Sequence, residues 1–214
     1  MASLFDTNQA VRIAKYFLED IEDPVNLVPV SLVVLCLAVA GRPRGLAWWA
    51  MFNGCIIHCW MDGIVGMFGR GPKWLVIEYG KLDSRYWPTK DSLVMMICAV
   101  ELLIMGPLCL LWYHAIIMDK WYKHFLAIIT STFQMMGCIL YFSAELYDGC
   151  EHIPFTTWPP TFTKFDDLFY FWFIYVFANG VWIIIPSYVM ITTLQEMYPI
   201  YIHSSQPKKS KKRN

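Results

Sequence analysis

The sequence predicts an all-α integral membrane protein with five transmembrane helices in one bundle. Of its 214 residues, 57% are hydrophobic and 16% are charged, whereas about 25% of residues are charged in an average soluble domain. The apolar residues gather in five runs, each close to the roughly 20 residues that a helix needs to cross a bilayer. The chain therefore divides into an N-terminal interfacial segment over 1–24, a five-helix membrane domain over 25–194 and a basic tail over 195–214.

Each element follows from its local pattern. Residues 6–20 mix apolar and polar side chains in the manner of a short helix that lies on the membrane interface. The first span, 25–41, is almost wholly apolar and is closed by "RPRG", and the second span, 45–68, follows at once. After a loop rich in charged and aromatic residues, the remaining three spans are 92–117, 121–146 and 168–194.

Basic residues set the expected orientation, because cytosolic loops of membrane proteins carry an excess of lysine and arginine. Five of the seventeen basic residues lie in "KKSKKR" at 208–213. A cytosolic C-terminus places them on the same side as Arg42, Arg44, Lys120 and Lys123. The final "KKRN" also reads as a di-lysine retrieval signal. We therefore expect a multi-pass protein of the endoplasmic reticulum membrane with a lumenal N-terminus.

Polar and ionisable side chains inside the predicted spans are few. An ionisable group at mid-membrane costs on the order of 2.5 to 3.5 kcal/mol on insertion scales, so those that are retained usually face an interior cavity and serve a function. The polar residues of the second to fifth spans include Asn53, His58, Asp62, Glu101, Thr130, Ser131, Thr132, Gln134, Glu145 and Asn179. The functional residues are expected among them.

His58 and Asp62 are four residues apart, so they lie on one helix face with their side chains in reach of each other. A carboxylate beside an imidazole favours its protonated form while burial opposes it, and the balance can make the pair a proton donor. Glu101 lies on the next span, and Asn179 shares a face of the last span with Trp182, whose indole can lie against a cation. These side chains together predict a pocket that moves protons on an apolar molecule.

Structural explanations stay open for the same residues. The pair of His58 and Asp62 can be a hydrogen bond that joins helices, and Glu101 can pair with a neighbouring helix. The segment "CIIHC" places Cys55 and Cys59 beside His58, but its spacing matches no structural zinc pattern, so no metal is predicted. Phosphate-binding glycine loops, nucleophile elbows and dinucleotide fingerprints are absent from the sequence, as are basic residues interleaved with aromatic ones for nucleic acid.

Five stretches carry a resemblance to a known family. They are "IIHCWMDG" at 56–63, "EYGKLDSRYW" at 78–87, "GPLCLLW" at 106–112, "QMMGCILYFSAELYDG" at 134–149 and "FYFWFIYVFANGVWIIIPS" at 169–187. In this order they resemble the emopamil-binding protein family of 3β-hydroxysteroid Δ8,Δ7-isomerases, which have an EXPERA-type membrane domain. The resemblance covers most of the chain, from about residue 45 to about residue 190.

The resemblance implies a five-helix protein of the endoplasmic reticulum that shifts a ring double bond in a sterol without a redox cofactor or a metal. By motif, His58 and Asp62 match the family's proton-donating pair, Asn179 and Trp182 match its amide and cation-facing indole, and Tyr86 closes the "DSRY" loop near the pocket. The implied partners are a sterol or related polycyclic terpenoid, the lipid bilayer, cationic amphiphilic inhibitors and a second copy of the chain in a homodimer.

Two positions depart from the family pattern. The family usually has a glutamate where this chain has Asp62, which shortens the reach by one methylene. Its third-helix glutamate lies eight residues before the "GP" pair, where this chain has Cys98, whereas Glu101 occupies a position three residues nearer that tends to be threonine. One helical turn keeps both residues on one face. We therefore predict Glu101 as the proton-accepting carboxylate, and we expect Cys98, Tyr86 and Gln134 to contact the substrate.

Two alternatives stay open beside a cofactor-independent sterol isomerase. The rearranged third helix also suits a related isomerase or cyclase that acts on another terpenoid. A non-catalytic sterol- or drug-binding paralogue would use the same pocket without turnover. A cousin family that includes the sigma-two receptor has a glutamate six residues before a proline, as Glu101 is before Pro107, but it lacks the "DSRY" and "NGVW" matches.

Overall fold

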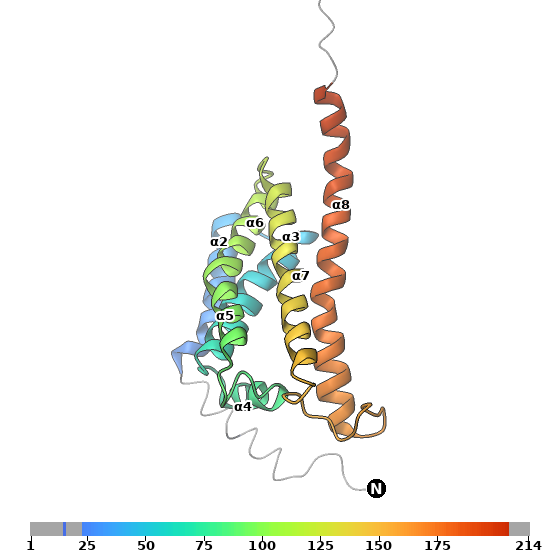
Figure 1. Ribbon diagram of the computed structural model, residues 1–214. Helices are drawn as coiled ribbons and strands as arrows, with labels where there is room; N and C mark the ends of the chain where they lie inside the picture. The colour runs from blue at the N-terminus through green and yellow to red at the C-terminus, as the bar shows by residue number, and fades with distance from the viewer. Residues whose placement is uncertain (1–14, 16–22, 206–214) are drawn as a thin grey trace, which may run out of the picture.

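The computed structural model describes residue 15 and residues 23–205, and this part of the chain is helical with no strand (Figure 1). The helices are η1 (Pro24–Leu27), α2 (Val28–Ala40), α3 (Leu46–Phe52), η2 (Asn53–Met67), α4 (Lys73–Leu82), α5 (Ser92–Val100), η3 (Glu101–Met105), α6 (Gly106–Ile117), α7 (Lys123–Tyr147), η4 (Asp167–Ala178) and α8 (Asn179–Ser205). Apart from Lys15, the predicted interfacial helix over 6–20 lies outside the described residues, as does the end of the tail, 206–214.

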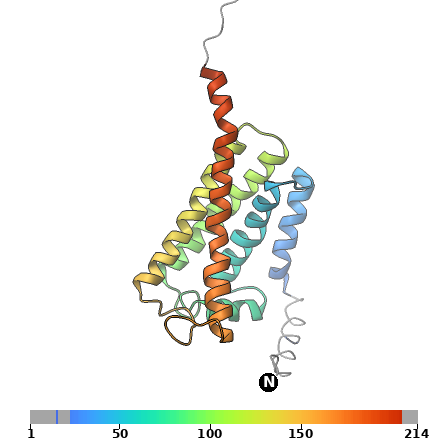
Figure 2. The same ribbon diagram turned by 90° about the vertical axis from the view of Figure 1, so that its right-hand side faces the viewer.

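Several helices continue directly into one another, so the molecule has fewer rods than helical segments. α3 runs into η2, α5 runs through η3 into α6, and η4 runs into α8. These rods, α2 and α7 form one bundle, with α4 lying across one end (Figures 1 and 2). The C-terminal half of α8 extends beyond the other helices at the opposite end, where α6 also turns into α7.

Three helices are long and apolar enough to cross a membrane, namely Ser92–Ile117, Lys123–Tyr147 and Asp167–Ile202. They correspond to the third, fourth and fifth predicted spans, although the last helix continues past residue 194 to Ser205. The first predicted span is a shorter apolar helix, Pro24–Ala40. The second is helical from Leu46 to Met67 but is not among the three candidates, because its polar residues lower its hydropathy. The structure thus supports three of the five predicted spans.

A π-helical turn separates α5 from α6, at the point where the sequence places Gly106 and Pro107. Proline has no amide hydrogen, and its ring collides with the carbonyl oxygen of the preceding turn in a regular α-helix. The helix widens here, because the amide of Gly106 donates to the carbonyl oxygen of Glu101, five residues earlier. Glu101 therefore begins the widened turn. Of the other two π-helical segments, η2 contains His58 and Asp62, and η4 ends directly before Asn179.

Glycines bring η2 against η3 and α6. A Cβ atom on Gly63 would lie 2.6 Å from Cδ1 of Leu102, and one on Gly106 would lie 2.5 Å from Sγ of Cys59. Ordinary contacts between carbon atoms are about 3.5 to 4.0 Å, so only glycine permits this approach. The close packing places the face of η2 that carries the predicted histidine and aspartate next to Glu101.

Candidate active site

The bundle contains a partly open cavity of about 520 Å³, a volume within the usual range for small-molecule sites. Its wall is formed by η2, α4, the segment 83–91, α5 with η3, α7, and η4 with α8, and most of the lining side chains are apolar or aromatic. The predicted site residues that reach this wall are His58, Asp62, Tyr86, Glu101, Gln134, Asn179 and Trp182.

Cys98 is the predicted contact residue that does not line the cavity. It is completely buried and packs in a core cluster with Val94 and Tyr141. Tyr86 packs against this cluster and lines the cavity itself. The spacing of one turn predicted a shared face with Glu101. The backbone between the two residues is ordinary α-helix, in which side chains three residues apart point about 60° apart. This offset leaves Cys98 in the core cluster and Glu101 at the cavity.

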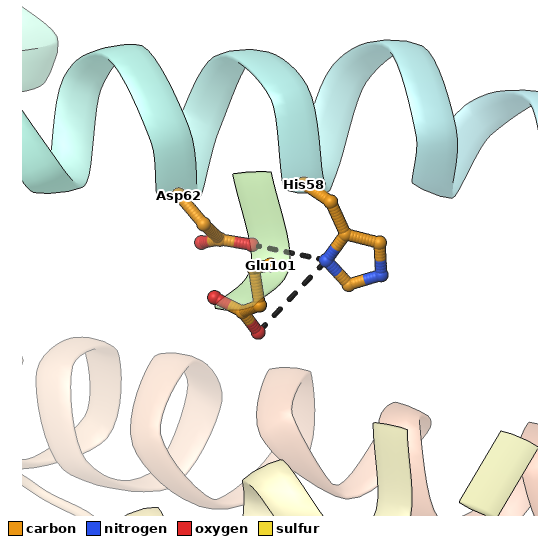
Figure 3. A group of neighbouring side chains, drawn as sticks. All are labelled: His58, Asp62 and Glu101. Atoms are coloured by element: carbon orange, nitrogen blue, oxygen red, sulfur yellow. Dashed lines mark ion pairs between the residues drawn. The ribbon is translucent and has the colours of Figure 1, made fainter. Parts of the chain in front are cut away.

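The centre of the site is a cluster of one imidazole and two carboxylates (Figure 3). Nδ1 of His58 lies 3.6 Å from Oδ2 of Asp62 and 3.8 Å from Oε1 of Glu101. The histidine side chain is 2% exposed, and the two carboxylates come from different helices, η2 and η3. Since all three groups meet at one nitrogen, a proton can pass from one helix to the other.

The same three side chains each offer a ligand atom within 4.8 Å of the others, an arrangement that could also hold a metal ion. This group differs from the "CIIHC" segment considered above. Sγ of Cys55 lies 3.7 Å from Sγ of Cys36 in the core, away from the imidazole. Removal of metal ions with a chelator therefore tests the prediction of a metal-free site.

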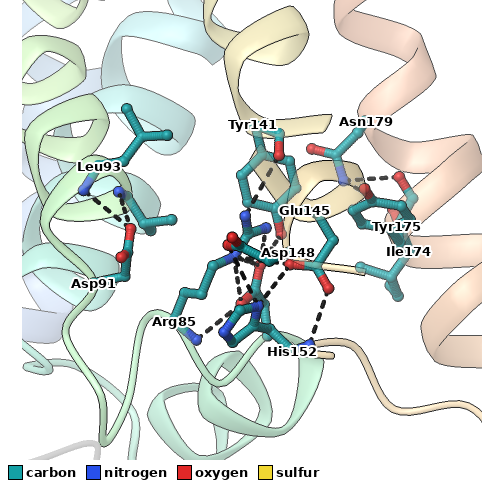
Figure 4. Close-up of polar contacts among 12 residues, drawn as sticks. Arg85, Asp91, Leu93, Tyr141, Glu145, Asp148, His152, Ile174, Tyr175 and Asn179 are labelled. Atoms are coloured by element: carbon teal, nitrogen blue, oxygen red, sulfur yellow. Dashed lines mark hydrogen bonds and ion pairs between the residues drawn. The ribbon is translucent and has the colours of Figure 1, made fainter. Parts of the chain in front are cut away.

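Trp182 and Asn179 are held in the wall by hydrogen bonds of their own. Nε1 of Trp182 donates to Oδ1 of Asn53 over 2.7 Å. Nδ2 of Asn179 donates to the carbonyl oxygens of Ile174 at 3.2 Å and Tyr175 at 3.0 Å (Figure 4). These carbonyls belong to the last turn of η4, where π-helical geometry gives way to α8. The side-chain amide nitrogen of Asn179 therefore forms hydrogen bonds with the backbone of η4, and Asn179 also lines the cavity.

A buried network of charged side chains supports the loop that carries Tyr86 (Figure 4). Nη2 of Arg85 lies 2.6 Å from Oδ2 of Asp83, and Nε lies 3.3 Å from Oε2 of Glu145 on α7. Nδ1 of His152 is 3.0 Å from the same Glu145 oxygen. Burial lowers the pKa of Arg85, but the hydrogen bond and charge of Asp83 outweigh it, so the net pKa lies above its usual range. The arginine therefore stays charged and ties the loop to α7.

Two residues beside the cluster were not assigned a role from the sequence. Asn53 is completely buried and belongs to the polar inventory of the second span, which is the only sequence signal for it. The hydroxyl of Tyr79 on α4 donates to Oδ1 of Asp62 over 3.5 Å. Burial, followed by the charge of Asp62, raises the pKa of Tyr79 well above its usual value, so this hydroxyl keeps its proton and acts as a donor.

Fold and site together define a class: an all-helical protein, with helices apolar enough to cross a membrane, that holds an acid–base cluster in an apolar cavity. Comparison with known families then places the chain. The model of the EXPERA (EXPanded EBP superfamily) domain matches residues 73–193. The chain belongs to this family, which confirms the resemblance seen in the sequence. The matched region contains Glu101 and Trp182 but begins after His58 and Asp62.

Individual relatives are similar over most of the chain. The mouse 3-beta-hydroxysteroid-Delta(8),Delta(7)-isomerase is 31% identical over 163 residues, which are 74% of this chain and 66% of the mouse protein. Isomeliandiol synthase of Ailanthus altissima is 30% identical over 171 residues, 76% of this chain and 74% of the plant protein. Protoglabretal synthase of Citrus sinensis is 28% identical over 167 residues, 74% of this chain and 70% of that protein. Relatives with different named activities are thus similar to this chain to nearly the same degree.

Proposed function

We propose that this protein is a sterol Δ8–Δ7 isomerase. The observation that carries the proposal is the meeting of His58 and Asp62 from η2 with Glu101 from η3 at the wall of an apolar cavity. Proton transfer by positioned side chains contributes about 10²- to 10⁴-fold to a rate. The similarity to the mouse isomerase supports a sterol as substrate.

The proposed reaction moves a double bond without changing the oxidation state of the substrate. The pair of His58 and Asp62 donates a proton to C9, whose new C–H bond takes the electrons of the alkene and leaves a cation at C8. Glu101 then removes a proton from C7, and the electrons of that C–H bond form the new double bond between C7 and C8. The proton returns from Glu101 to Asp62 past Nδ1 of His58, which lies within 3.8 Å of both carboxylates.

The wall around the cluster suits a short-lived cation. The indole of Trp182 lines the cavity, and a cation over an indole face gains about 2 kcal/mol or more when it is desolvated. The amide of Asn179 adds a dipole on the same wall. The mostly apolar lining disfavours water beside the cation, where it would otherwise add to it. Cationic amphiphiles that mimic this intermediate are expected to inhibit the enzyme.

A second candidate is an isomerase or cyclase that acts on a different polycyclic terpenoid. Two observations favour it: the carboxylate that reaches His58 is Glu101 rather than a residue at position 98, and the Ailanthus synthase is about as similar to this chain as the mouse isomerase is. A carboxylate at another height along the helix would remove a proton from another carbon. A non-catalytic binding protein is the remaining alternative, and it would bind such ligands without turnover.

The proposed location is the endoplasmic reticulum membrane with the C-terminus in the cytosol and five membrane passages. The apolar helices support membrane insertion, and the basic tail supports this orientation. Protease protection of a C-terminal epitope tag in sealed microsomes tests it, because a cytosolic tag is digested and a lumenal one is protected.

The function is tested by expression in a yeast strain that lacks its own sterol isomerase, followed by mass spectrometry of the sterols. Formation of the Δ7 product is expected from the wild-type chain and not from His58→Ala or Glu101→Gln. Binding of a cationic amphiphile to the purified variants shows that the pocket is intact. Full turnover by either variant contradicts the assignment. A new terpenoid product would favour the second candidate, and ligand binding without any product would favour the non-catalytic one.

A further inference from the structure

A chain of hydrogen bonds ends on the nitrogen of His58 that faces away from the carboxylates. It begins at Asn53, whose Nδ2 donates to the carbonyl oxygen of Trp49 over 2.8 Å. Oδ1 of Asn53 accepts from Nε1 of Trp182 over 2.7 Å. A peptide carbonyl can only accept and an indole nitrogen can only donate. Both partners therefore require the same orientation of the Asn53 amide.

Gln134 on α7 extends the chain. Its Nε2 donates to Oδ1 of Asn53 over 3.0 Å and lies 3.3 Å from Nε2 of His58. The reverse orientation of the Gln134 amide would put two oxygen acceptors against each other. Oε1 of Gln134 is buried and has no hydrogen-bond partner among the described residues. The hydrogen bond to Asn53 thus sets the orientation of the Gln134 amide, and Oε1 of Gln134 contributes no hydrogen bond that would favour either orientation.

This arrangement selects one tautomer of His58. The amide nitrogen of glutamine carries two hydrogens and accepts none, so Nε2 of His58 must be the acceptor and bears no hydrogen. The single N–H of the neutral imidazole is then at Nδ1. That nitrogen faces Asp62 at 3.6 Å and Glu101 at 3.8 Å.

We propose that Asn53 and Gln134 are positioning residues that hold His58 in the Nδ1–H tautomer and so keep the mobile proton of the cluster between the imidazole and the two carboxylates. The proposal rests on the proposed function, because it assigns the donated proton to the side of Nδ1 and Asp62. It also connects Trp182 with His58. The indole N–H of Trp182 donates to the amide of Asn53, and Asn53 in turn orients the Gln134 amide that contacts His58.

The tautomer can be measured without turnover. The chain has five histidines, so ¹⁵N-histidine labelling of the full protein in detergent gives few signals, and His58→Gln identifies the one from His58. The wild-type protein is expected to show a protonated Nδ1 and an unprotonated Nε2. Gln134→Glu replaces the donor with an acceptor and is expected to move the proton to Nε2. The same variant is expected to lower kcat about 10²- to 10⁴-fold with little change in KM.

Thr130→Val is the matched control, because Thr130 lies on the same helix and is completely buried, and its hydroxyl donates to the backbone carbonyl oxygens of Leu126 and Ala127 on that helix. It is expected to keep the wild-type tautomer and turnover. A wild-type protein with the proton on Nε2 overturns the inference, and so does an unchanged tautomer in a folded Gln134→Glu variant. If both tautomers are as expected but the wild-type protein isomerises no Δ8-sterol, the positioning role stands and the proposed function fails.

Discussion

The contact between Gly63 and Leu102 gives the sharpest test of how the carboxylate of Glu101 is positioned. In Gly63→Ala the new Cβ would lie 2.6 Å from Cδ1 of Leu102, 3.1 Å from its Cβ and 3.0 Å from the carbonyl oxygen of His58. Rotation of the leucine relieves only the first contact, because its Cβ is part of the clash. The backbone of η3 must therefore retreat from η2.

The expected size of the effect follows from these distances. The shortest contact is roughly 1 Å below an ordinary separation of carbon atoms, and Leu102 directly follows Glu101. A retreat of about 1 Å lengthens the present 3.8 Å between Glu101 and His58 and is expected to lower kcat about 10²-fold. Overpacking costs about 1 to 3 kcal/mol, but alanine is favoured over glycine within a helix by about 0.5 to 1 kcal/mol. The net cost to folding is therefore about 0 to 2.5 kcal/mol, no more than the roughly 2.7 kcal/mol that corresponds to a 10²-fold loss of turnover.

The assay compares turnover of a Δ8-sterol with the midpoint of thermal unfolding followed by tryptophan fluorescence. Gly180→Ala is the matched control, because a Cβ at this helical position meets nothing within 4 Å. It is expected to keep full turnover and to unfold at the same or a slightly higher temperature. Turnover of Gly63→Ala within about threefold of wild type, where about 10²-fold is expected, would refute the reasoning. An equal loss of turnover in Gly63→Ala and Gly180→Ala would also refute it.

Three further predictions concern the surroundings of the site. Arg85→Met leaves the buried carboxylates of Asp83 and Glu145 without the arginine cation. We therefore expect the free energy of unfolding, measured by denaturant titration, to fall by about 3 to 5 kcal/mol. Near-wild-type stability would contradict this expectation. Asp91→Ala removes the side chain that caps α5 by accepting from the amides of Leu93 and Val94. The cost of about 1 kcal/mol should lower the unfolding midpoint by about 2 to 4 °C and leave turnover unchanged. Lost turnover would show that Asp91 has a different role. Prolonged dialysis against a strong chelator should leave turnover unchanged, because proton transfer between carboxyl groups requires no Lewis acid; loss of activity that Zn²⁺ restores would show that the cluster holds a metal.

The sequence determined the helical class and the identity of the polar groups, for reasons that are local. Long apolar runs can satisfy their backbone hydrogen bonds only within helices when they lie in lipid, and three of the predicted spans appear as such helices. The spacing of His58 and Asp62 predicted their contact, since residues four apart meet on any helical face, and their side chains lie 3.6 Å apart.

Tertiary structure decided which groups meet across helices. The sequence placed Cys98 and Glu101 on one face, but the packing of the helices puts Cys98 in a core cluster and leaves Glu101 at the cavity. In the sequence Asn53 is one polar residue among several, and only the packing of α7 and α8 brings Gln134 and Trp182 to its oxygen. The physical reason is that periodicity describes regular helices one at a time, whereas close approach at glycines and changes of helical pitch are set by how the helices fit together.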